Sequence, residues 1–128
     1  MSEINDADTY AVISCALAVY QSMGYGFLEI LYKNAMKIEL SERNIPFTAE
    51  KKVKIYYKKY NIGTHYIDLF IYDHIVVELK TTATPIDCHI RQVKNYLKST
   101  NTEIGLLFNF APQKLLWKRI YNPDIQKS

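Results

Sequence analysis

Two carboxylates and a lysine interrupt apolar runs of this sequence, where charged side chains are costly to place. Asp68 lies within residues 67–72, and Glu78 and Lys80 lie within residues 75–80. Carboxylate oxygens suit Mg²⁺ or Mn²⁺, cations that keep several waters and bind substrate phosphates. A lysine beside them can hold a phosphate or lower the pKa of an attacking water. The alternative is a solvated sheet face on which each acid pairs with a lysine, because short patterns of this kind are common.

The hydrophobic pattern predicts that the two runs form a β-hairpin, which brings these side chains together. Apolar residues recur at odd positions from 67 to 71 and from 75 to 79, as expected when they share one buried face. A loop of three residues, 72–74, keeps both apolar sets on that face, and three is a common hairpin loop length. The cross-strand pairs predicted by this register are Leu69–Val77, Ile71–Ile75, Asp68–Glu78 and Tyr66–Lys80.

The rest of the chain predicts a sheet with helices packed against it. Apolar periodicity of the helical type marks residues 8–22, 27–43 and 85–98, the last opened by Pro85. Alternating runs predict strands at 47–57, in the hairpin 65–81, around 106–108 and at 115–120. The order ααβββαββ predicts an α/β or α+β fold with one mixed sheet. No linker or repeat interrupts residues 1–128, so a single domain is expected.

Composition excludes several classes of protein. Hydrophobic residues make up 48% and charged residues 23% of the 128 residues, as in globular rather than disordered chains. No apolar window approaches the roughly 20 residues of a membrane span, and the acidic N-terminus is unlike a signal peptide. Cys15 and Cys88 form no CxxC motif and are predicted to be buried, reduced thiols, which favours a cytoplasmic location. The scattered histidines, His65, His74 and His89, are expected to be solvated or turn residues.

The lysines are unevenly distributed, although the net charge of +3 is too mild to predict nucleic-acid binding by itself. Lys52 and Lys54 are the candidates for contacts with a phosphate backbone. The alternative is that they belong to a solvated strand face. The full cluster in and just after this predicted strand is Lys51, Lys52, Lys54, Lys58 and Lys59.

Five sequence blocks stand out when they are taken in order along the chain. They are Gly26-Phe-Leu-Glu29-Ile-Leu-Tyr32, Ile67-Asp68-Leu69, Val77-Glu78-Leu79-Lys80, Gln92-Val-Lys-Asn-Tyr96-Leu97 and Gly105-Leu-Leu-Phe-Asn109-Phe110. In this order, the blocks resemble the PD-(D/E)xK nuclease superfamily and, within it, the small bacterial GxxExxY family. The blocks run from Gly26 to Phe110, and the resemblance covers roughly residues 10–120. One departure is local, because residues 64–67 are Thr-His-Tyr-Ile where many relatives carry an arginine before the Ile-Asp pair.

The resemblance implies a nuclease that hydrolyses phosphodiester bonds with Mg²⁺ or Mn²⁺ as its cofactor. Asp68 and Glu78 would bind the metal, with the Leu79 carbonyl as a further ligand. Lys80 would stabilise the attacking hydroxide or the pentacovalent phosphate. Glu29, in the first turn of its helix, would add a metal contact directly or through water.

Two residues of the third predicted helix complete the implied site. Gln92 and Tyr96 lie one turn apart, like the QxxxY motif of the lambda-exonuclease branch, and could position the lysine, a water or a phosphate. Core packing is the alternative for Tyr96. An ion pair with Lys33, four residues further along the helix, is the alternative for Glu29. Asn109 either ends its strand or approaches the site.

The implied partner is nucleic acid, with DNA favoured over RNA, and a homodimer is left open. A chain of this class can also keep the fold and lose turnover. The competing hypothesis is therefore a catalytically silent nuclease-fold module that binds nucleic acid or a protein partner. The intact set of two acids and a lysine favours the enzyme, because a binding module has little use for opposed carboxylates.

Overall fold

The order of elements along the chain is the predicted one, ααβββαββ, in a computed structural model that describes residues 6–83 and 87–125. The helices are α1 (Asp6–Met23), α2 (Glu29–Glu42) and α3 (Asp87–Thr100). The strands are β1 (Phe47–Tyr57), β2 (Tyr60–Ile71), β3 (Ile75–Lys80), β4 (Ile104–Phe110) and β5 (Leu115–Tyr121). The predicted start of the third helix at Pro85 lies outside the described residues.

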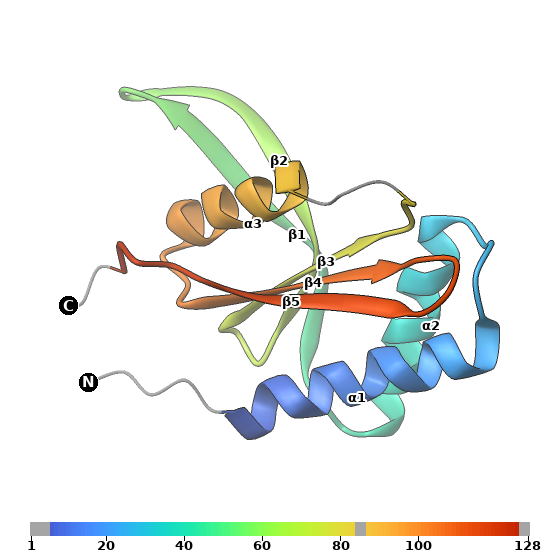
Figure 1. The fold of residues 1–128 in the computed structure, drawn as a ribbon. Coiled ribbons are helices and arrows are strands. Elements are labelled where there is room, and N and C mark those ends of the chain that lie inside the picture. The colour runs from blue at the N-terminus through green and yellow to red at the C-terminus, as the bar shows by residue number, and fades with distance from the viewer. Residues whose placement is uncertain (1–5, 84–86, 126–128) are drawn as a thin grey trace.

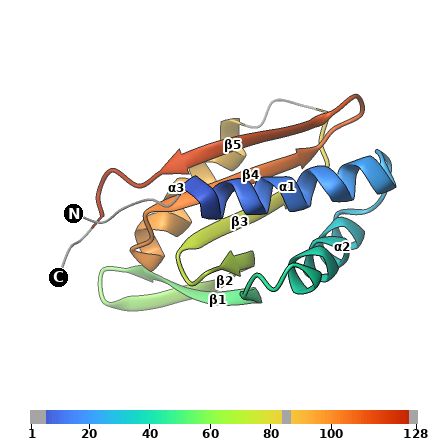
Figure 2. The same cartoon turned by 90° about the horizontal axis from the view of Figure 1, so that it is seen from below.

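The five strands form one mixed sheet in the order β1-β2-β3-β4-β5 (Figures 1 and 2). Strands β1, β2 and β3 are antiparallel neighbours, β3 and β4 are parallel, and β4 and β5 are antiparallel. A parallel pair needs a crossover connection, and α3 supplies it. This α+β arrangement confirms the predicted fold class and puts β3, with its acid and lysine, in the centre of the sheet.

The sheet separates two apolar cores, one on each face. Helices α1 and α2 cover one face, and α3 covers the other (Figure 1). Strand β4 is buried along its whole length between them. Because both of its faces are covered, its sequence does not alternate and is apolar at every position except Asn109.

The alternation of side chains reverses in the middle of β1 and β2. Ala49 and Leu69 pack against the core under α1 and α2, whereas Val53 and Ile67 pack in the core under α3, although all four positions are odd. The reversal falls where Glu50 of β1 has a left-handed backbone, with φ of 55°. The prediction that the odd positions 67, 69 and 71 share one face is therefore wrong at residue 67. A period of two holds only while the strand is unbroken.

The β2–β3 hairpin has the predicted three-residue loop. Ile71 pairs with Ile75, so residues 72–74 lie between the strands. Tyr72 and Asp73 have φ of 55° and 60°, and the His74 N–H donates to the Ile71 carbonyl at 3.1 Å. These features are typical of a type I′ turn, whose twist matches the flanking strands. His74 is a turn residue, as expected.

The predicted register of this hairpin is confirmed only in part. Leu69 pairs with Val77, as predicted, but the paired register ends there. The predicted pairs Asp68–Glu78 and Tyr66–Lys80 are not part of the ladder. The Asp68 side chain accepts a hydrogen bond from the Leu79 N–H at 2.9 Å in place of a backbone pairing, so β2 separates from β3 beyond this point.

The two cysteines differ in exposure. Cys15 is buried in α1, as predicted, whereas Cys88 is exposed, and the prediction of burial is wrong there. Cys88 shares a helix face with the exposed Gln92, four residues further on. Among the described residues, no helix is both long enough and apolar enough to cross a membrane.

Candidate active site

Asp68 and Glu78 come together where β2 and β3 separate. The Asp68 carboxylate accepts a hydrogen bond from the Leu79 N–H of β3. Lys33 of α2 also approaches this carboxylate, with its Nζ 3.5 Å from Oδ1. Glu78 precedes Leu79 on β3 and is only 5% exposed. We call Asp68 and Glu78 the acid pair.

Burial and mutual repulsion make the acid pair a poor place for two negative charges. Burial, followed by the negative charge of Asp68, raises the pKa of Glu78 to about 9, and the charge of Lys80 opposes the rise. Among the described residues, Oε1 of Glu78 has no hydrogen-bond partner. Buried polar atoms are rarely left unpaired. Two such carboxylates fit a hard divalent cation, which would bind the free oxygen and neutralise the repulsion.

Lys80 ends β3, and the neighbouring strand fixes the chain that follows it. Lys80 is paired with Asn109 of β4. The Asn109 side chain accepts from the Thr82 N–H at 2.9 Å and donates to the Thr82 carbonyl at 2.8 Å. The charge of Lys80 lowers the pKa of Glu78 and of Glu29, so the lysine acts electrostatically on both acids. Asn109 therefore acts on the site by holding the segment that follows the lysine.

Glu29 is the first residue of α2, and the other GxxExxY residues build the turn before it. Gly26 has φ of +113°, a conformation that favours glycine. Tyr32 is fully buried, and its hydroxyl donates to the Gly24 carbonyl at 2.5 Å and accepts from the Phe27 N–H at 3.3 Å. These two hydrogen bonds hold the turn against the first turn of α2, so the motif positions its own acid.

Glu29 shares the electrostatic environment of the acid pair. Burial raises its pKa, Lys80 opposes the rise, and Asp68 adds to it. Lys33, its expected alternative partner, forms its ion pair with Asp68. Within the described part of the chain, no three or more His, Cys, Asp or Glu side chains are arranged to hold a metal ion. Glu29 therefore lies near the acid pair without joining it in one group of ligands.

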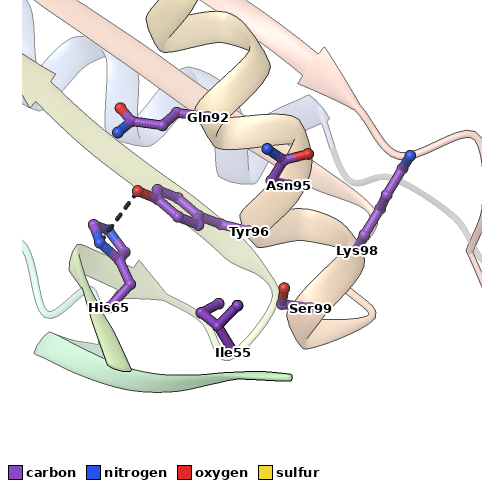
Figure 3. A pocket seen from close by; sticks show the side chains of 7 residues that line it. All are labelled: Ile55, His65, Gln92, Asn95, Tyr96, Lys98 and Ser99. Atoms are coloured by element: carbon purple, nitrogen blue, oxygen red, sulfur yellow. Dashed lines mark hydrogen bonds between the residues drawn. The ribbon is translucent and has the colours of Figure 1, made fainter. Parts of the chain in front are cut away.

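Tyr96 links α3 to β2 through His65 (Figure 3). The Tyr96 hydroxyl lies 3.1 Å from Nδ1 of His65, and the two rings stack with centroids 3.9 Å apart and planes 14° apart. Burial, then the charges of Glu78 and Asp68, raise the pKa of Tyr96 to about 12. Tyr96 also packs in the core under α3. Core packing, the alternative for this residue, is therefore confirmed, and a role in positioning the lysine, a water or a phosphate stays a prediction.

His65 is a residue of the site that sequence reasoning missed. Its Nε2 lies 3.7 Å from Oε1 of Glu78, beyond hydrogen-bond distance. Burial lowers the pKa of His65, so at neutral pH a neutral imidazole faces the acid rather than an ion-pair partner. The expectation of a solvated or turn residue is wrong here. His65 precedes Asp68 by three residues, and in a regular strand two side chains at this spacing lie on opposite faces. The reversal of alternation in β2 lies between them, so this rule does not apply to the pair.

A pocket of about 540 Å³ lies between α3 and the first two strands, next to His65 (Figure 3). Gln92 and Tyr96 both line it, as expected for residues one turn apart on a helix. Lys52 and Lys54, the predicted nucleic-acid contacts, lie elsewhere, exposed on β1. The full lining is Ile55, His65, Gln92, Asn95, Tyr96, Lys98 and Ser99.

Comparison with known proteins identifies the superfamily. A family model described as the PD-(D/E)XK nuclease superfamily matches residues 6–120, and the chain belongs to this superfamily. The crystal structure of SSO0001 is similar with a TM-score of 0.58 at 18% sequence identity, over 95% of this chain and 71% of that one. An alkaline exonuclease, LHK-Exo from Laribacter hongkongensis, is similar with a TM-score of 0.54 at 14% identity, over 97% of this chain and 73% of that one. At these identities the likeness supports the fold alone. No curated protein matches the sequence significantly.

Proposed function

We propose that this chain is a divalent-metal-dependent nuclease of the GxxExxY type, which hydrolyses phosphodiester bonds of nucleic acid, DNA in preference to RNA. The observation that carries the proposal is the acid pair. Glu78 is buried beside Asp68 with its pKa raised to about 9, and Lys80 follows two residues later. A carboxylate in a structural ion-pair network would have a lowered pKa, whereas the pKa of Glu78 is raised. In a chain of a nuclease superfamily, a buried pair of like charges supports a cation site.

Asp68 and Glu78 are the residues that would hold Mg²⁺ or Mn²⁺, with the Leu79 carbonyl as a further oxygen ligand. Glu29 would reach the cation through a water, which accords with its place beside the acid pair rather than within it. The cation, when bound, polarises phosphate oxygens and lowers the pKa of a water. Lys33 and the Leu79 N–H orient the Asp68 carboxylate for this task.

Lys80 is proposed to stabilise the negative charge that develops on the phosphate in the transition state. Tyr96 is a positioning residue, because its contact with His65 supports the side chain that faces Glu78. Gln92 is exposed on the same helix face and is free to donate an amide hydrogen bond to a phosphate or a water.

Cleavage assays with single- and double-stranded DNA and RNA, in Mg²⁺, Mn²⁺ or EDTA, test the proposal. The wild type should cleave DNA with either cation and be inactive in EDTA. Lys80→Ala should lower turnover by about two orders of magnitude or more and keep cation and nucleic-acid binding, because the lysine acts mainly in the transition state. Lys118→Ala removes an exposed lysine on β5, an edge strand of the sheet, and should keep full activity.

The same assays separate the enzyme from the competing hypothesis. A wild type that binds nucleic acid and cleaves none of the substrates with either cation would favour the silent nuclease-fold module. A wild type that neither binds nor cleaves would reject both hypotheses. A Lys80→Ala variant with unchanged turnover would keep the nuclease but remove the lysine from its chemistry.

A further inference from the structure

Residues 51–67 form the outer part of the β1–β2 hairpin and contain no aspartate or glutamate. In Figure 1 the far ends of β1 and β2 extend past α3 at the upper left, away from the other strands. We call residues 51–67 the lysine–tyrosine arm. Such a concentration of one charge attracts polyanions. The residues for which the arm is named are Lys51, Lys52, Lys54, Lys58 and Lys59 with Tyr56, Tyr57, Tyr60 and Tyr66.

The tyrosines of the arm are strongly exposed. The exposed fraction is 58% at Tyr56, 61% at Tyr57, 71% at Tyr60 and 54% at Tyr66. By contrast, Tyr96 of α3 packs in the core between this helix and the sheet and is only 7% exposed. Exposed aromatic rings gathered on one segment mark a surface that meets a partner.

One face of the arm is open and combines both residue types. Helix α3 covers the face that bears the odd-numbered residues, such as Ile67. Lys52 is paired directly with Tyr66, and Lys54 with Thr64. Directly paired residues put their side chains on the same face of a sheet, which is here the face away from α3. All four of these residues are exposed, so lysine and tyrosine side chains lie next to each other on an open strand surface.

Along β2, the arm leads to the acid pair. Tyr66 precedes Asp68 by two residues, which is roughly 7 Å along a strand. We propose that the lysine–tyrosine arm binds single-stranded nucleic acid, with Lys52 and Lys54 against phosphates and an unpaired base stacked on Tyr66. The inference rests on the proposed function and narrows its substrate class to single strands.

Base stacking is the reason for a single strand rather than a duplex. A tyrosine ring can stack only on a base whose face is free, and pairing and stacking within a duplex hide these faces. Positive grooves with exposed aromatic side chains bind single strands in this way, largely without regard to sequence. A duplex would use only the lysines of the arm and leave its tyrosines unpartnered.

Fluorescence anisotropy in EDTA, which prevents metal-dependent cleavage, tests the inference with three labelled probes of equal length. The probes are an oligothymidylate, a strand with the same backbone but abasic sites, and a DNA duplex. The wild type should bind the oligothymidylate about tenfold or more tightly than the abasic strand. Tyr66→Ala should remove about tenfold of the affinity for the oligothymidylate and none of the affinity for the abasic strand. Tyr66→Phe keeps the ring and should bind like the wild type.

Matched variants separate stacking from charge and from folding. Lys52→Ala should weaken binding of both single-stranded probes equally and flatten its dependence on salt. Tyr60→Ala changes the most exposed tyrosine of the arm and should repeat the base-dependent loss without affecting the melting temperature. Tyr121→Ala removes a half-exposed tyrosine from β5, at the opposite sheet edge, and should bind like the wild type.

Equal losses on both single-stranded probes in Tyr66→Ala, or tighter binding of the duplex by the wild type, would overturn the inference. Its failure is distinguishable from failure of the nuclease proposal because the readout is binding without turnover. If the wild type cleaves DNA with Mg²⁺ but shows no base-dependent affinity, only the proposed role of the arm is contradicted. If the wild type binds through Tyr66 and never cleaves, the nuclease proposal is contradicted and the proposed role of the arm stands.

Discussion

Glu78 is a residue whose surroundings, more than its type, define its chemistry. A glutamate on a solvated strand is ionised at neutral pH, but burial and the charge of Asp68 raise the pKa of Glu78 to about 9. The folded, metal-free protein therefore holds a proton on this residue that the unfolded chain releases near pH 4.5, the ordinary value of a glutamate.

The pH dependence of stability follows from this difference. Below pH 4.5 both states are protonated, and Glu78 adds no pH dependence. Between pH 4.5 and 9 the folded state holds more protons than the unfolded state, so the free energy of unfolding falls as pH rises. Glu78→Gln removes the titration and keeps the shape. Its stability relative to wild type should rise by as much as about 1.4 kcal/mol for each pH unit in this window.

Urea unfolding in EDTA at three pH values between 5 and 8.5 measures this difference. Asp73→Asn, in the exposed β2–β3 turn, is the control for an acid-to-amide change outside the acid pair. Asparagine tolerates the left-handed backbone found at this position. A stability difference between Glu78→Gln and the wild type that stays constant with pH would show that Glu78 is ionised in the folded protein.

At the scale of elements, the close approach of α3 to β4 positions the third helix. Gly105 lies beneath the helix, and a Cβ atom there would lie 2.6 Å from Cγ1 of Val93 and 3.3 Å from the Val76 carbonyl oxygen. Only a residue without a side chain permits this approach. Gln92 and Tyr96 are on the same helix, so their distance from β2 depends on the glycine beneath it.

Gly105→Ala should lower the free energy of unfolding by about 1–3 kcal/mol, because the added methyl overpacks the interface. Val93→Ala should lose stability by leaving a cavity instead. In the double variant the two changes compensate, because the shortest contact is with Val93, so the combined loss should be smaller than the sum by about 0.5 kcal/mol or more. Denaturant unfolding of the four proteins measures the coupling, and strict additivity would mean that the helix shifts as a whole.

At the scale of the whole molecule, the site joins elements from both faces of the sheet. Asp68 comes from β2 and Glu78 from β3, Lys33 approaches from α2, and Tyr96 reaches β2 from α3 through His65. A ligand bound to the acid pair would therefore connect parts of the fold that pack in different cores.

A cation that binds only the folded state should stabilise the whole protein. Mg²⁺ or Mn²⁺ at about 100 times its dissociation constant should add about 2.7 kcal/mol and raise the melting temperature by several degrees. Asp68→Asn should abolish this rise and leave the metal-free protein folded, because the amide oxygen still accepts from the Leu79 N–H. Differential scanning calorimetry with and without cation measures both effects. An undiminished rise in the variant would exclude Asp68 from the metal site.

The sequence by itself determined the features that depend on local order. Alternation, helical periodicity and turn chemistry were sufficient for the element order, for the three-residue hairpin loop and for the pairs Leu69–Val77 and Ile71–Ile75. These features involve one element or two adjacent strands, where periods of 3.6 and 2 apply directly. The ordered motifs were likewise sufficient for the superfamily, because they lie at fixed positions along the chain.

Only the tertiary structure decided which of the two cores the odd-numbered side chains in each half of β2 face. It also decided which residues surround the acid pair. A left-handed residue in β1, Glu50, accompanies the reversal of alternation in both strands, and a repeat of two cannot anticipate it. Lys33 pairs with Asp68, 35 positions away, rather than with Glu29 on its own helix. His65 reaches Tyr96 across 31 positions. These contacts depend on how α2 and α3 pack against the sheet, and local sequence patterns do not specify that packing.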